Sequence, residues 1–162
     1  MKKVGGNMNR ILLAVDLTDF SEELISTAIF FCKSLQAQMR VLHVNASAPY
    51  SFAPHDPATP VADLSKEIDP STFDALGNIH QQLIAEDIRC DFRELDGPAE
   101  SNILAAADEY KADLIVIGGH QHGHFYQCFF GTRTESVIRR APCPVVVVPQ
   151  HDGAVKIPKY PA

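Results

Sequence analysis

The residues with the most evident chemistry lie in one stretch of the sequence, residues 118–135, which reads GGHQHGHFYQCFFGTRTE. His120, His122 and His124 occupy alternate positions in it, and glycines stand near both ends. Alternate imidazoles on an extended segment could ligate zinc, whereas glycines let the backbone approach an anion closely. A third interpretation is that the stretch only turns a strand into a helix.

The spacing of the glycines favours a phosphate site. Gly118 ends the apolar run DLIVIG, and Gly131 precedes a segment with helical periodicity, which gives the pattern G-x2-Q-x9-G-T. A helix N-terminus presents unpaired N–H groups and a partial positive charge, so it can bind a phosphate. The amides, hydroxyls and guanidinium of such a seat would come from Gly131, Thr132, Arg133 and Thr134. Thr132 and Glu135 also have the spacing of a capping box, which would instead satisfy the helix amides internally.

A metal site has less support in the sequence. No carboxylate or cysteine lies at a convincing ligand spacing from the three histidines, and the four cysteines form no CxxC or CxxH pattern. The cysteines are therefore interpreted as small apolar residues. A metal-dependent hydrolase that uses His120, His122 and His124 is retained as the remote alternative function. His43, inside a predicted strand, is interpreted as a core histidine whose ring has a hydrogen-bond partner.

Five short runs, four of them rich in branched apolar residues, predict the strands that would position these groups. They cover residues 10–16, 39–45, 88–95, 113–118 and 144–149. The run at 88–95 alternates apolar and polar residues, which is typical of a strand near the edge of a sheet. Helical periodicity predicts a helix in each interval between strands, and Pro98 is expected at the first helical position of the third helix.

Strands that alternate with helices imply right-handed crossovers between parallel strands. The expected fold class is therefore α/β, a single doubly wound five-stranded parallel sheet with helices on both faces. In such sheets ligands bind beyond the carboxyl ends of the strands, where the strand order reverses. The chain reads DLTDFS after the first strand, without a glycine, which excludes the Rossmann and P-loop phosphate motifs at that turn.

Composition and charge indicate one soluble domain. A chain of 162 residues with 46% hydrophobic residues can bury a core. We expect residues 9–150 to form the domain that contains this core. A flexible N-terminus is expected at 1–8 and an extended or disordered tail at 151–162. The net charge of −6, without a long basic cluster, argues against nucleic acid or an anionic membrane as a partner. The first apolar run is too short for a signal peptide or a membrane span, so a cytoplasmic location is expected.

The chain resembles the universal stress protein family over residues 9–150. The resemblance rests on a first strand ending in Val15-Asp16, the L-H-V of the second strand, the I-G-x-H after the fourth and the G-T before the last helix. It implies the strand order 3-2-1-4-5 of adenine nucleotide alpha hydrolase-like folds. It also implies a stress-response protein that binds ATP or AMP, with or without Mg2+, as a sensor or adaptor. Efficient catalysis is not expected, while slow hydrolysis or autophosphorylation stays open.

The resemblance assigns roles to individual residues. In the nucleotide-binding branch of the family, G-x2-G-x9-G-S/T holds the ATP phosphates, and this motif falls on Gly118, Gln121, Gly131 and Thr132. Asp16 and the backbone of Val44 would recognise adenosine. The remaining residues that would line the cleft are Ile117, His120, Arg133 and Thr134, while His122 and His124 would face solvent.

One residue departs from the family motif. Gln121 replaces its second glycine, and a side chain there would oppose binding by about 1 kcal/mol or more if the position needs a positive φ or a close approach of phosphate. A second hypothesis is therefore a nucleotide-free dimeric interaction protein. With or without a nucleotide, the resemblance implies a homodimer that pairs through the edge strand containing Val145, Val146, Val147 and Val148. The alternative is that a tail or loop covers this edge.

Overall fold

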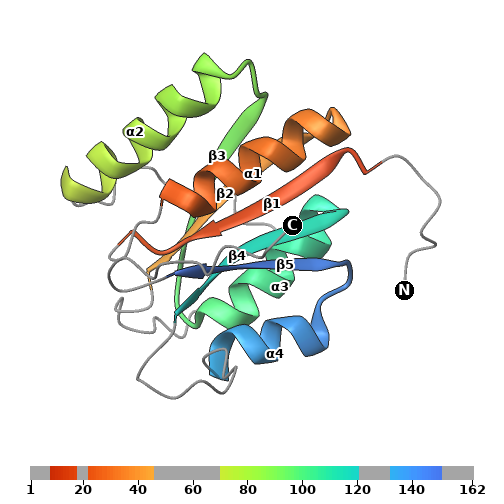
Figure 1. Ribbon diagram of the computed structural model, residues 1–162. Coiled ribbons are helices and arrows are strands. Elements are labelled where there is room, and N and C mark those ends of the chain that lie inside the picture. The colour runs from red at the N-terminus through yellow and green to blue at the C-terminus, as the bar shows by residue number, and fades with distance from the viewer. Residues whose placement is uncertain (1–7, 18–21, 46–69, 121–131, 151–162) are drawn as a thin grey trace, which may run out of the picture.

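The computed structural model describes residues 8–17, 22–45, 70–120 and 132–150. Strands and helices alternate along the chain (Figure 1). The strands are β1 (Arg10–Val15), β2 (Gln38–Asn45), β3 (Cys90–Asp96), β4 (Leu114–His120) and β5 (Val145–Gln150). The helices are α1 (Glu22–Leu35), α2 (Pro70–Ala85), α3 (Ala99–Tyr110) and α4 (Thr132–Arg140). Residues 46–69, which follow β2 and contain four prolines, lie outside the described residues.

The five strands form one parallel sheet in the order β3-β2-β1-β4-β5. This confirms the expected α/β class, the doubly wound sheet and the strand order. The strand with alternating polarity, β3, lies at one edge, and the valine-rich β5 lies at the other. Each predicted strand is present, with its ends shifted by at most two residues.

Successive side chains of the central strands pack alternately into two separate cores, one on each face of the sheet. Ile11 and Leu13 of β1 pack with α1 and α2 on one face of the sheet, while Leu12 packs with α3 and α4 on the other. Figure 1 shows these two helix pairs on opposite sides of the sheet. A strand covered on both faces needs apolar residues at successive positions, which explains the unbroken apolar run of β1.

Three helices end in the same way at the amino edge of the sheet. Gln36, Asp87 and Lys111 follow α1, α2 and α3, and each has a positive φ, of 50°, 56° and 56° respectively. In each case the N–H of the next residue donates to a carbonyl five residues earlier, such as Ala37 N–H to Cys32 O at 2.9 Å. This is the geometry of the left-handed C-cap, which closes a helix before a strand begins.

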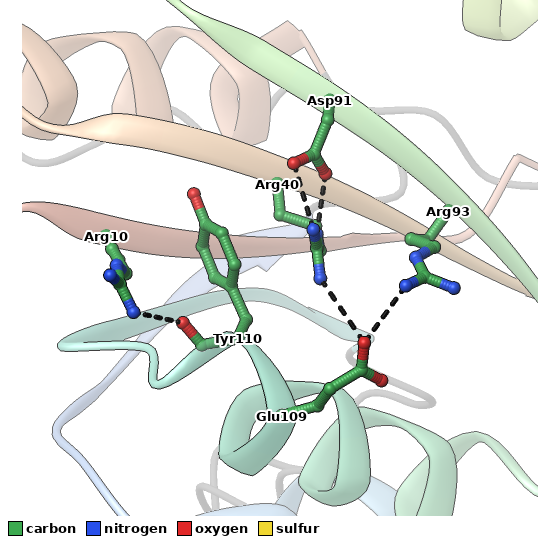
Figure 2. Close-up of polar contacts among 6 residues, drawn as sticks. All are labelled: Arg10, Arg40, Asp91, Arg93, Glu109 and Tyr110. Carbon is green, nitrogen blue, oxygen red and sulfur yellow. Dashed lines mark hydrogen bonds and ion pairs between the residues drawn. The ribbon is translucent and has the colours of Figure 1, made fainter. Parts of the chain in front are cut away.

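Charged side chains hold the last turn of α3 against β1, β2 and β3 (Figure 2). The guanidinium of Arg40 donates to both carboxylate oxygens of Asp91, at 2.6 and 3.0 Å, and lies over the Tyr110 ring at 4.4 Å from its centroid. Glu109 accepts from Arg93 at 2.9 Å, and Arg10 donates to the backbone oxygen of Tyr110 at 3.1 Å. We call these six residues the amino-edge network. The partners of Arg40 raise its pKa, the hydrogen bond to Asp91 having the largest effect.

One helix start differs from the expectation. Pro98 is the N-cap of α3, with φ −64° and ψ 124°, and the helix begins at Ala99. Pro98 was expected to be the first residue inside the helix, whereas it is the residue that precedes the helix. The extended ψ of Pro98 explains the difference, because a residue inside the helix would need a helical ψ.

Candidate functional site

The strand order reverses at β1. From β1 the chain reaches β2 through α1 on one face of the sheet, and β4 on the other side of β1 is entered from α3 on the opposite face. Helices that leave in opposite directions open a crevice at the carboxyl ends of the strands, where doubly wound proteins bind ligands. The candidate site is therefore the carboxyl edge of β1 and its neighbours.

Strand register brings four of the predicted site residues to this edge. Val15, the last residue of β1, pairs with His43, and Ala14 pairs with Ile117. Asp16 therefore follows β1 at the level of Val44 on one side and the glycines of β4 on the other. Asp16 is exposed, Val44 and Gly118 are half-buried, and Ile117 is buried at 4% exposure.

The buried His43 lies directly beneath this edge. Its side chain is 9% exposed, and its Nδ1 lies 3.3 Å from the carbonyl oxygen of Val15. The contact links the end of β2 to the end of β1, next to Asp16. The interpretation of His43 as a core histidine with a hydrogen-bond partner is confirmed.

A tight turn follows β3 at the same edge. Gly97 has φ 112°, a conformation that a side chain would oppose, and its N–H donates to Asn45 O at 3.0 Å. The Asn102 side chain donates to Asp96 O at 3.0 Å. These bonds fix the connection from β3 to α3 beside the end of β2.

The phosphate-seat residues are only partly described. Helix α4 begins at Thr132, as expected, and Thr134 in its first turn is half-buried. The Glu135 carboxylate lies 3.6 Å from the Arg139 guanidinium, one turn further along the helix. His120 is the last residue of β4. Gln121, His122, His124 and Gly131 lie outside the described residues, as do the side chains of His120, Thr132 and Arg133.

A contact between α3 and α4 was not predicted from the sequence. Glu100, in the first turn of α3, accepts hydrogen bonds from the Ser136 hydroxyl and from Arg140 Nη1, the latter at 2.8 Å. The pKa of Glu100 is lowered, chiefly by the bond from Ser136 and further by Arg140. Because Glu100 is 36 residues from Ser136 in sequence, no local pattern indicates the contact.

The described residues contain no group of three histidine, cysteine or acidic side chains that could hold a metal ion. The metal hypothesis itself depends on His122 and His124, which are not described. Within the same ranges, no helix is long and apolar enough to span a bilayer.

Comparison with known proteins finds a family match over nearly the whole chain. The model of the universal stress protein family matches residues 7–149. The chain belongs to this family. Universal stress protein YxiE of Bacillus subtilis is 23% identical over 145 residues, which cover 86% of this chain and 98% of YxiE.

Solved structures of universal stress proteins share the fold. UspA from Lactobacillus plantarum superposes with a TM-score of 0.65 at 23% identity, over 88% of this chain and 99% of UspA. A universal stress protein from Archaeoglobus fulgidus DSM 4304 gives a TM-score of 0.62 at 25% identity, over 90% of this chain. The match covers 45% of that second chain. Other matched structures of the family contain dAMP, cAMP or AMP.

Proposed function

We propose that this universal stress protein binds an adenine nucleotide at the carboxyl edge of β1 and β4, and that ATP is its ligand. The observation that carries the proposal is the convergence of Asp16, Val44 and Gly118 on the edge where α4 begins. Members of the family in complex with dAMP, cAMP or AMP support the choice of an adenine nucleotide.

Each group at the edge suits one part of the ligand. The exposed carboxylate of Asp16 can accept hydrogen bonds from ribose hydroxyls or the adenine amine, and the backbone of Val44 can pair with the base. The half-buried Gly118 has no side chain to block the approach of the nucleotide. The start of α4, at Gly131, Thr132, Arg133 and Thr134, would bind the phosphates through amide donors, with Mg2+ as an accompanying ion.

The proposed role is that of a sensor or adaptor. Nucleotide occupancy at the carboxyl edge would alter the surface formed by the connections after β1, β2 and β4, and rapid turnover is not part of the proposal. Slow hydrolysis or autophosphorylation is compatible with it. The proposed location is the cytoplasm, where adenine nucleotides are abundant.

The proposal includes a homodimer formed through β5. This strand is a sheet edge, and Val145, Val146 and Val147 are half-buried there, while Val148 is buried. An edge strand with open backbone groups pairs readily with a second copy. Size-exclusion chromatography with light scattering measures the assembly. Substitution of Val147 by proline should shift a dimer to the monomer, because the register with β4 leaves the Val147 N–H on the open side of the strand and proline removes that donor.

Calorimetric titration with ATP, AMP and cAMP tests the nucleotide site. We expect Asp16→Ala to weaken binding about tenfold or more, the effect of losing hydrogen bonds to a charged group. The matched control is Asp108→Ala. It removes an exposed carboxylate from the last turn of α3, at the amino edge of the sheet and away from the proposed site, and should leave the affinity unchanged. Absence of binding at millimolar ATP would refute the proposal.

Analysis of the protein as purified provides a second test. Heating releases any bound nucleotide into the supernatant, where chromatography identifies AMP, ADP or ATP. A co-purifying nucleotide would contradict the alternative of a nucleotide-free dimeric interaction protein. That alternative rests on Gln121 in the place of the second motif glycine.

A further inference from the structure

Helix α4 depends on α3 for its position. It has nine residues, and Val137 is its one side chain that is almost fully buried, at 1% exposure, within the described part of the helix. Figure 1 shows α4 beside α3 on the same face of the sheet, and Val137 packs in the core that α3 lines. A short helix with little buried surface has low stability of its own.

Glu100 is the polar link between the two helices. Its Oε1 accepts from the Ser136 hydroxyl and from Arg140 Nη1, so one carboxylate oxygen contacts two successive turns of α4. The Glu100 side chain is 28% exposed, less than the Arg140 side chain at 67%. We call Glu100, Ser136 and Arg140 the α3–α4 clasp.

The clasp lies one turn behind the start of α4. Thr132 precedes Ser136 by four residues, which is about 6 Å along a helix. The amides of the first turn can face a phosphate only if the rest of the helix is held in register with the carboxyl edge. Anion binding at a helix N-terminus depends on the first turn, because the favourable field falls off beyond it.

From this geometry we propose that Glu100 is a positioning residue for the phosphates of the bound nucleotide. It acts through Ser136 and Arg140, which fix α4 against α3, and it does not touch the ligand. The inference rests on the proposed nucleotide site. It adds to that site a residue on α3 that controls affinity for the phosphate groups and leaves recognition of adenosine to the ends of β1 and β2.

A direct electrostatic effect of Glu100 and a positioning effect predict opposite changes in ATP affinity when its carboxylate is removed. Removal of a carboxylate near a phosphate site relieves repulsion and would strengthen binding of ATP. Loss of positioning weakens it. Glu100→Ala is therefore expected to reduce ATP affinity about five- to tenfold, the range of a well-placed helix terminus, while adenosine binds as in the wild type.

Two further variants separate the contacts. Ser136→Ala removes one hydrogen bond without changing the charge, and should reduce ATP affinity in the same direction by about threefold. Glu109→Ala is the matched control, since it removes a carboxylate from the other end of α3, where Glu109 is 64% exposed. This control should keep the wild-type ratio of ATP to adenosine affinity.

The experiment is calorimetric titration of each variant with ATP and with adenosine, combined with hydrogen exchange of residues 132–140. The expected result is a reduced ratio of ATP to adenosine affinity in Glu100→Ala and Ser136→Ala, with faster exchange in α4. An equal loss of affinity for both ligands would indicate general destabilisation and overturn the inference. If the wild-type protein binds ATP and the clasp variants keep its ratio of ATP to adenosine affinity, the inference about Glu100 is overturned while the proposed function stands. A wild-type protein that binds neither ligand would overturn the proposed function first.

Discussion

At the amino edge of the sheet the connections 36–37, 86–89, 111–113 and 141–144 have two to four residues, and three of them contain a left-handed C-cap residue. At the carboxyl edge the connections 16–21, 97–98, 46–69 and 121–131 range from two to twenty-four residues. The longer ones leave β1, β2 and β4, the strands nearest the candidate site. Short closed turns on one edge stabilise a scaffold whose other edge is free to carry ligand-binding sequence.

The contacts that stabilise the fold gather at the amino edge, whereas the proposed binding site lies at the carboxyl edge. The amino-edge network joins three strands to α3 through arginine, carboxylate and aromatic contacts. The carboxyl edge instead gathers the exposed Asp16 and the half-buried Val44 and Gly118. Variants at the two edges should therefore change different measured quantities.

The largest effect is expected from Tyr110→Ala. The ring is 9% exposed, packs in the core beneath α3 and lies under Arg40. Truncation of a buried aromatic residue should lower the free energy of unfolding by about 3 to 4 kcal/mol, measured by urea denaturation. Tyr110→Phe keeps the ring and should stay within about 1 kcal/mol of the wild type. If both variants bind ATP like the wild type, the separation of the edges holds; a selective loss of ATP binding would break it.

Alkaline pH should also lower the free energy of unfolding, through groups near the amino edge of the sheet. Burial raises the pKa of the Cys32 thiol from 9.0 to about 12, with Cys90 adding to the shift, and burial raises the pKa of Tyr110 from 10.0 to about 12. Both groups bind a proton more tightly in the folded state. The stability that these two groups contribute should therefore be constant below pH 9 and fall as the pH rises from 9 towards 12.

Tyr110→Phe provides the test of this pH dependence. The variant lacks one of the two groups, so its free energy of unfolding should decline less than that of the wild type between pH 10 and 12. Urea denaturation at pH 8, 10 and 11 measures the difference. Parallel declines in the two proteins would show that the Tyr110 hydroxyl does not contribute.

At the carboxyl edge, Gln121→Gly restores the glycine of the family motif. If the side chain opposes the approach of phosphate by about 1 kcal/mol, ATP should bind about fivefold more tightly. Adenosine affinity and the free energy of unfolding should not change. Calorimetry with both ligands checks this, and an unchanged ATP affinity would mean that Gln121 is not an obstacle.

The smallest effect is expected at the helix C-caps. Gln36→Gly and Asp87→Gly relieve a left-handed conformation that disfavours side chains, so each should raise the free energy of unfolding by about 0.5 to 1 kcal/mol. Ala85→Gly, inside the last turn of α2, should instead destabilise by about 1 kcal/mol. Nucleotide affinity should be the same in all three variants. A fall in stability for Gln36→Gly would contradict the C-cap explanation.

Local patterns were sufficient to predict most of the fold. The apolar run of β1 and the alternation in β3 predicted a central strand and an edge strand, because burial on two faces or one face dictates which side chains a strand can carry. The start of α4 at Thr132 was likewise expected from the sequence. Pro98 was expected at the first helical position but is the N-cap, since a proline at either position gives the same local sequence pattern.

The candidate site was predictable only in part. Asp16, Val44 and Gly118 could be placed at one edge, because parallel strands that alternate with helices bring their carboxyl ends together. The clasp could not be predicted, since Glu100 meets Ser136 and Arg140 only through the packing of two helices. Gln121, His122, His124 and Gly131 lie outside the described residues, so their roles stay predictions, as do the expected domain limits.

The sequence by itself determined the number of strands, their parallel arrangement and the edge at which polar residues collect, because hydrophobic periodicity acts over a few residues and parallel topology follows from it. The tertiary structure alone decided which charged groups meet. Arg40 contacts Asp91 and Tyr110, and Glu100 contacts Ser136 and Arg140, across separations of 36 to 70 residues. Such contacts depend on lateral register and helix packing, which a local pattern does not encode.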